Sequence, residues 1–197
     1  MEKINHSSFI KQAIQQSIDL KTSLLQNAEL IEKINDISNR CIDMFQQGNR
    51  LLIAGNGGSA ADAQHIAAEF VCRLNFERPG LPAMALATNY SVITAAGNDY
   101  SFDEVFSREV EANGRKGDIF IGISTSGNST NILKAIEACH QAGIYTVGLA
   151  GDSGAIQNSA DICLNVPSDH TPRIQECHIL IGHILCEIVE NNLFPRL

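Results

Sequence analysis

The sequence predicts an α/β fold in which a five-stranded parallel sheet is covered by helices on both faces. From Arg50 onward, five short apolar runs alternate with stretches of helical periodicity. The runs are apolar throughout, without polar alternation, which is typical of parallel strands buried on both faces. Ligands bind such sheets beyond the carboxyl ends of the strands, and the Gly-rich and Ser-rich motifs of this chain directly follow expected strands.

The alternating pattern places each element in turn. The expected strands are Leu51–Gly55, Ala83–Ala87, Ile119–Ile123, Tyr145–Ala150 and Ile162–Val166. The expected helices within this region are Ser59–Leu74, Tyr90–Ala96, Phe102–Asn113, Ser129–Ala142, Ala155–Ser159 and Thr171–Leu193. Parallel strands need such crossover helices between them, so spacing and fold class agree.

Residues 7–48 form two consecutive amphipathic helices ahead of the α/β region. Their apolar residues recur at three- and four-residue steps, Asn27 suits a cap between the helices, and Gly48 suits the C-terminal stop. A helix pair this long needs a surface to cover, and we favour another subunit over packing within the chain. We treat residues 1–197 as one domain, with a helical extension (1–48) and an α/β core (49–197).

Composition excludes several classes of protein. The 197 residues carry a net charge of −8, which disfavours non-specific binding to nucleic acid or to anionic membranes. No apolar run approaches the roughly 18 residues of a membrane span, and the first residues lack a signal-peptide core. The six cysteines include no C-x-x-C pair. We therefore expect a cytoplasmic protein with reduced cysteines and no nucleic-acid or membrane partner.

The first motif follows the first strand. A Gly-rich turn, Gly55–Gly58, offers N–H groups to an anion, and we expect Ser59 to cap the next helix with Asp62 as its partner. His65 and Glu69 then lie one turn apart on one face of that helix. Either piece alone is an ordinary turn or surface contact, but their combination favours a functional site.

The second motif is Ser-Thr-Ser-Gly-Asn-Ser at residues 124–129, between a buried strand and a helix. Hydroxyl and backbone N–H groups at a helix N-terminus form a cradle for an anion. The motif lacks the order of a nucleotide P-loop, and the earlier Gly-rich turn lacks the last glycine of a dinucleotide fingerprint. A small phosphomonoester therefore fits best; the alternative is that Ser129 merely caps the helix.

Three other groups of polar residues leave their roles open. Asn98 and Asp99 fit an Asx turn and a polyol contact equally well. We interpret Arg73 and Arg78, which flank a Pro-containing loop, as solvated charges in preference to phosphate contacts. In the last helix, Gln175, His178 and His183 interrupt an apolar pattern, and the long side chains of Gln175 and His183 can converge. A histidine on such a helix is more often a hydrogen-bonded core residue.

Taken together, GNGGSAADAQH, STSGNS and RIQE followed by His183 resemble the sugar isomerase (SIS) family of phosphosugar-binding domains, and within it the phosphoheptose isomerases. The resemblance runs from about residue 8 to residue 194. It implies a flavodoxin-like SIS fold, a homotetramer, and conversion of D-sedoheptulose 7-phosphate to D-glycero-D-manno-heptose 7-phosphate by enediol proton transfer. That reaction feeds ADP- or GDP-heptose synthesis for lipopolysaccharide or other surface glycans.

The resemblance also implies roles for individual residues. One Zn²⁺ per subunit is implied at four positions: His65, Glu69, Gln175 and His183. Glu69 and His183 match the acid/base pair. The implied substrate contacts are Asn56, Gly57, Gly58, Glu69, Asn98, Asp99, Ser124, Thr125, Ser126, Ser129 and Gln175. Pro172 departs from members that carry an aspartate there, and Asp169 is a candidate substitute.

Two rival functions belong to other classes. A non-catalytic SIS protein that binds a replication initiator resembles this chain even in its final residues, but it lacks the carboxylate and histidine that match Glu69 and His183. A phosphosugar-sensing regulator carries an added DNA-binding domain, for which this chain has no room. The presence of Glu69 and His183 favours the enzyme.

Overall fold

The computed structural model describes residues 6–195 and confirms the α/β fold, with five parallel strands in one sheet. The strands are β1 (Leu51–Gly55), β2 (Ala83–Ala85), β3 (Ile119–Ser124), β4 (Tyr145–Ala150) and β5 (Ile162–Asn165). Their order in the sheet is β2-β1-β3-β4-β5. This order places a topological switch point between β1 and β3, which pair from Leu51–Ile119 to Gly55–Ile123.

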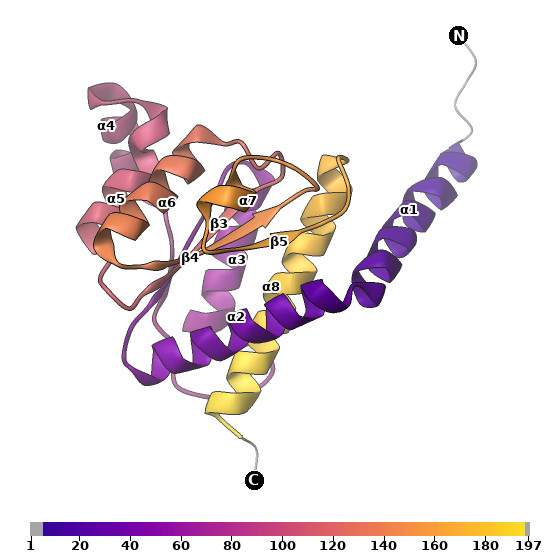
Figure 1. The fold of residues 1–197 in the computed structure, drawn as a ribbon, viewed down its shortest axis with the longest axis horizontal. Coiled ribbons are helices and arrows are strands. Elements are labelled where there is room, and N and C mark those ends of the chain that lie inside the picture. Colours follow the sequence, from indigo (N-terminus) through magenta and orange to yellow (C-terminus); the bar gives the residue numbers. More distant parts are fainter. Residues whose placement is uncertain (1–5, 196–197) are drawn as a thin grey trace.

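Helices cover both faces of the sheet (Figure 1). They are α1 (His6–Gln26), α2 (Ala28–Gln46), α3 (Gly58–Val71), α4 (Tyr90–Asp99), α5 (Val105–Asn113), α6 (Thr130–Ala142), α7 (Ile156–Ser159) and α8 (Thr171–Leu193), with a 3₁₀ turn η1 at Phe102–Glu104. Alternate strand residues point to opposite faces. Ile53 packs in the core with α2, α3 and α8, whereas Leu52 packs in the core with α5 and α6.

Several predicted boundaries differ from the structure by a few residues. The predicted cap at Ser59 is wrong: α3 begins at Gly58, and its N-cap is Gly57, whose φ of +57° favours glycine. Ser59 is buried, and its N–H donates to the carbonyl of Asn56. Strand β2 stops two residues early because Ala87 has a φ of +56°. The predicted helix over 102–113 divides into η1 and α5.

The N-terminal helices follow the prediction at their boundaries. Asn27 caps α2, its Oδ1 accepting the N–H of Leu30 at 3.0 Å, and Gly48 ends it with a φ of +79°. Helix α1 extends away from the body of the molecule (Figure 1). Only Leu24 of α1 is buried. Its large exposed apolar side chains are Phe9, Ile10, Ile14, Ile18 and Leu25.

All six cysteines are unpaired, as predicted, and only Cys72 is exposed. Burial raises the pKa of Cys41 and of Cys139 to about 12, so neither thiol ionises near neutral pH. Within residues 6–195, no helix combines the length and the apolar character that crossing a membrane requires.

Candidate active site

Helices α3 and α8 lie against each other and bring distant residues together. The side chain of Ile66 on α3 packs directly on Gly182 of α8, where a Cβ atom would lie 2.5 Å from Cδ1 of Ile66. His65 and Glu69 project from α3, and His183 follows Gly182 on α8. The packing of α3 on α8 therefore brings His65 and Glu69 close to His183, which lies 118 positions after His65 in the sequence.

The three side chains form one compact cluster. Nε2 of His65 lies 3.1 Å from Nε2 of His183 and 3.1 Å from Oε1 of Glu69. The two imidazole rings meet edge to face, with centroids 4.9 Å apart. The exposed fraction of the side chain is 49% for His65 and 21% for Glu69, so a small molecule can reach the cluster from solvent.

This cluster fits a zinc ion. One ligand atom from each of the three residues lies within 4.8 Å of the other two. Two imidazole nitrogens and a carboxylate oxygen are ligands that zinc prefers, and three protein ligands leave a position open for substrate, as in catalytic zinc sites. The donor set of His65, Glu69 and His183 therefore suits the implied metal.

Gln175 lies about two turns before His183, near the start of α8. Its side-chain amide packs on Gly58, the first residue of α3, where a Cβ atom would meet Nε2 of Gln175 at 2.6 Å. The amide thus faces the Gly-rich turn that follows β1. The predicted roles of Gln175 in substrate binding and as a metal ligand both stay predictions.

Two loops meet at the switch point between β1 and β3. Asn56, in the turn after β1, exchanges two hydrogen bonds with Asn131 of α6, at 2.9 and 3.0 Å. This amide pair ties the Gly-rich turn to the helix that follows the Ser-rich loop. Because Asn131 engages both ends of the Asn56 amide, Asn56 has its backbone, the second N–H of Nδ2 and the second lone pair of Oδ1 to offer a substrate.

The Ser-rich loop between β3 and α6 turns its hydroxyls toward one another. Oγ of Ser124 lies 2.9 Å from Oγ of Ser129 and 3.3 Å from the N–H of Ser129. Ser129 occupies the N-cap position of α6, but its side chain makes no capping bond. The alternative in which Ser129 serves only as a cap is therefore weakened, and an anion cradle at this helix N-terminus is favoured.

Comparison with known proteins identifies the family of the chain. The model of the SIS domain family matches residues 16–151. A relative named phosphoheptose isomerase from Aneurinibacillus thermoaerophilus is 54% identical over 189 residues, which are 95% of this chain and 96% of the relative. The chain belongs to the phosphoheptose isomerase family. Phosphoheptose isomerase 2 of Campylobacter jejuni is 55% identical over 197 residues, covering 100% of this chain and 97% of that relative.

A solved structure extends the comparison to the fold. A phosphoheptose isomerase from Francisella tularensis superposes with a TM-score of 0.91 and 38% identity, covering 95% of this chain and all of that chain. Membership of the phosphoheptose isomerase family does not support the rival in which the chain is a non-catalytic partner of a replication initiator.

Two of the predicted substrate contacts, Asn98 and Asp99, lie apart from the cluster of histidines and Glu69. Asn98 and Asp99 lie at the exposed end of α4, and Nδ2 of Asn98 donates to Oδ1 of Asp99 at 2.8 Å. Figure 1 shows α4 at the opposite side of the molecule from α1, away from α8. The substrate contacts of Asn98 and Asp99 stay predictions, as do those of Thr125 and Ser126.

Sequence reasoning missed the surroundings of two residues, Asp62 and Arg78. Asp62 lies near both histidines; burial raises its pKa, the charges of His65 and His183 oppose the rise, and its Oδ2 is buried without a partner. This environment of Asp62 was not predicted, because its position three residues after Ser59 is typical of a capping box. The interpretation of Arg78 as a solvated charge or phosphate contact is wrong, since its side chain is 2% exposed. Arg73 is exposed, as predicted.

Proposed function

We propose that the chain interconverts D-sedoheptulose 7-phosphate and D-glycero-D-manno-heptose 7-phosphate. The observation that carries this proposal is the convergence of Glu69 and His65 on α3 with His183 on α8. Relatives at 54% and 55% identity are named phosphoheptose isomerases, which supports the same substrate class.

Aldose–ketose isomerisation moves one proton between C1 and C2 of the sugar. In the proposed reaction, Glu69 takes a proton from C1 of the ketose while His183 protonates the oxygen on C2, which yields an enediol. Glu69 then returns the proton to C2, and His183 accepts the proton from the oxygen on C1, which yields the aldose. A base for the carbon and an acid for the oxygen are the two groups that this reaction needs.

His65, Glu69 and His183 would hold the zinc ion, with Gln175 as the proposed fourth ligand. Because Nε2 of His183 faces His65, Nδ1 of His183 is the proposed atom that exchanges the proton with the sugar oxygens. When bound, zinc supplies a Lewis acid that stabilises negative charge on a substrate oxygen. Glu69 has two carboxylate oxygens, and Oε1 is the one that faces His65. The second oxygen is therefore the proposed base, since an oxygen that ligates a metal is a poorer base.

The Ser-rich loop is the proposed site for the phosphate. Ser124 ends β3, Ser126 lies in the loop, and Ser129 is the N-cap of α6, where backbone N–H groups and the helix dipole favour an anion. The amide pair of Asn56 and Asn131 keeps this loop beside the Gly-rich turn. With the seven-carbon chain of the sugar extended, binding the phosphate there would direct the reacting carbons toward α3 and α8.

We further propose a cytoplasmic homotetramer that serves heptose synthesis for lipopolysaccharide or other surface glycans. The six unpaired cysteines support a reducing compartment. The uncovered apolar side chains of α1 support contact with another subunit.

The test is an NMR assay with purified protein and sedoheptulose 7-phosphate. The expected result is formation of the aldose 7-phosphate and, in D₂O, deuterium at C2 of that aldose. If the protein gives no turnover at any zinc concentration but binds a replication initiator, the enzyme proposal is overturned.

A further inference from the structure

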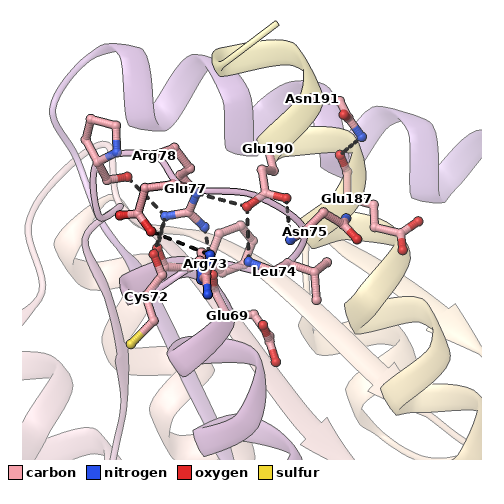
Figure 2. Close-up of polar contacts among 12 residues, drawn as sticks. Glu69, Cys72, Arg73, Leu74, Asn75, Glu77, Arg78, Glu187, Glu190 and Asn191 are labelled. Atoms are coloured by element: carbon pink, nitrogen blue, oxygen red, sulfur yellow. Dashed lines mark hydrogen bonds and ion pairs between the residues drawn. The ribbon is translucent and has the colours of Figure 1, made fainter. Parts of the chain in front are cut away.

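Arg78 and Glu190 form a buried ion pair that the proposed chemistry does not use. Their side chains are 2% and 1% exposed, and Nε of Arg78 lies 3.1 Å from Oε1 of Glu190. Figure 2 shows the pair between the loop that follows α3 and the last turns of α8. Removing two charges from water is costly, so a buried pair is by itself weak support for stability. Its placement between these two helices points to another role.

On one side, Arg78 binds the C-terminal end of α3. Its Nη2 donates to the carbonyl of Glu69 at 2.7 Å, and its Nη1 donates to the carbonyls of Phe70 at 2.6 Å and Cys72 at 3.3 Å. Carbonyls at a helix end lack partners within the helix, and a cation there also complements the helix dipole. Arg78 therefore holds the backbone of the residue whose side chain is the proposed base.

On the other side, Glu190 belongs to the face of α8 that carries His183. Seven residues separate them, which is about two turns, so both project to the same side of α8. Oε1 of Glu190 accepts the N–H of Leu74 at 3.1 Å, and Oε2 accepts the N–H of Asn75 at 2.9 Å. The carboxylate thereby fastens α8 to the chain that leaves α3.

We propose that Arg78 and Glu190 are positioning residues that set the register of α3 against α8 and so hold His65 and Glu69 at His183. This inference rests on the proposed roles of Glu69 and His183. Apolar contacts such as Ile66 on Gly182 are non-directional and tolerate sliding. The guanidinium and carboxylate bind these three carbonyls and two N–H groups in fixed directions, so a shift between the helices breaks the hydrogen bonds.

The experiment compares changes at this pair with a matched control. The test variants are Glu190→Gln, Arg78→Lys and the double variant Arg78→Met/Glu190→Leu. The control is Asp118→Asn. Asp118 is also a buried carboxylate that accepts two backbone N–H groups, from Arg50 at 3.0 Å and Arg115 at 2.9 Å, but it joins the amino ends of β1 and β3.

Four properties are measured for each protein: the melting temperature, the zinc affinity by titration, the kinetic constants kcat and KM, and the ¹⁵N signals of labelled histidine in metal-free protein. In the wild type, the 3.1 Å contact requires one Nε2 to donate and the other to accept, which gives two distinct signals. This last readout requires neither zinc binding nor catalysis.

Glu190→Gln and Arg78→Lys should weaken zinc binding at least about 10-fold, the lower end for residues that orient ligands. They should also abolish the paired Nε2 signals and lower kcat more than they raise KM. Asp118→Asn should lower the melting temperature and leave zinc affinity and histidine signals unchanged. The double variant should regain melting temperature, because apolar side chains replace buried ion pairs well, without regaining zinc affinity.

The inference is overturned if both single variants keep wild-type zinc affinity and histidine signals, or if Asp118→Asn loses them equally. A wild type that neither binds zinc nor isomerises the sugar would overturn the proposed function instead. The histidine signals would then still decide whether the pair positions the two helices.

Discussion

At the scale of residues, the contact between His65 and His183 has a chemical consequence. Two imidazole nitrogens 3.1 Å apart must share a proton, and a metal bound between them would take both lone pairs instead. Metal binding would therefore move the Nε2 proton to Nδ1 of the same ring, a change of tautomer that releases no proton from the neutral pair.

The first prediction concerns the metal. Purified protein should bind about one zinc ion per subunit, as expected for one such three-residue cluster. Chelation should lower activity and added zinc should restore it, as measured by metal analysis and the NMR assay. Full activity in rigorously metal-free protein would contradict the zinc proposal and leave the isomerase proposal standing.

The second prediction concerns the base. Glu69→Gln keeps the shape of the side chain and removes its basicity, so turnover should fall by about 10² or more. Calorimetric binding of the substrate should survive because the Ser-rich loop is unchanged. Glu77→Gln is the matched control, since Glu77 is an exposed glutamate eight residues later. Near-normal turnover in Glu69→Gln would show that another group takes the proton.

The third prediction concerns His178, which is fully buried. Its Nε2 donates to the carbonyl of Ala150 at 3.1 Å, and burial lowers the pKa of His178 to about 4. Between pH 6.5 and 4 the unfolded chain binds a proton that the folded protein does not, so the free energy of unfolding should fall by roughly 3 kcal/mol as the pH drops through this range.

His178→Gln keeps an Nε2 donor and cannot titrate. Urea unfolding at pH 7 and at pH 4.5 should show a smaller acid loss in the variant than in the wild type. An equal loss in both proteins would assign acid sensitivity to other groups.

At the scale of elements, the two loops at the β1/β3 switch point divide the proposed work. The turn after β1 leads into the helix that carries His65 and Glu69, and the loop after β3 presents the hydroxyls. Because the amide pair of Asn56 and Asn131 joins them, binding energy from the phosphate can be used to orient the reacting carbons.

The fourth prediction tests that loop. Ser124→Ala removes the hydroxyl that contacts Ser129, so kcat/KM for the phosphorylated sugar should fall several-fold or more. Unphosphorylated sedoheptulose should be a very poor substrate for the wild type. Ser159→Ala is the control and should behave as wild type, since Ser159 is a half-buried serine of α7 whose Oγ donates to the carbonyl of Ala155. Equal turnover of both sugars would exclude the phosphate role.

At the scale of the whole molecule, α1 is the element whose large apolar side chains remain mostly exposed in a single chain. Its side chains Phe9, Ile14 and Ile18 are more than half exposed, at 61%, 56% and 52%. Grouped apolar side chains of this kind mark surfaces that bind other proteins. A second copy of the chain is the proposed partner.

The fifth prediction follows from that surface. Ile14→Glu combined with Ile18→Glu should dissociate the proposed tetramer in sedimentation velocity, because each change places a charge in an apolar contact. Gln15→Glu adds a charge to the same helix at an exposed polar position and should leave assembly intact. A wild-type protein that sediments as an active monomer would contradict this prediction.

The sequence by itself determined the sheet and the motifs at its carboxyl edge. The strands Leu51–Gly55 and Tyr145–Ala150 have the predicted bounds. A buried strand needs continuous apolar residues, and such a run can be recognised from the local sequence alone. The spacing of His65 and Glu69 also placed them on one helix face without knowledge of the fold.

Tertiary structure alone decided which distant residues meet. His183 reaches His65, and Gln175 reaches Gly58, only through the packing of α3 on α8, and no local pattern encodes that register. Arg78 has the appearance of a surface charge in a polar loop, yet Glu190, 112 positions later, makes its burial tolerable. A charge is buried only where a partner compensates it, and the partner is known only once the chain has folded.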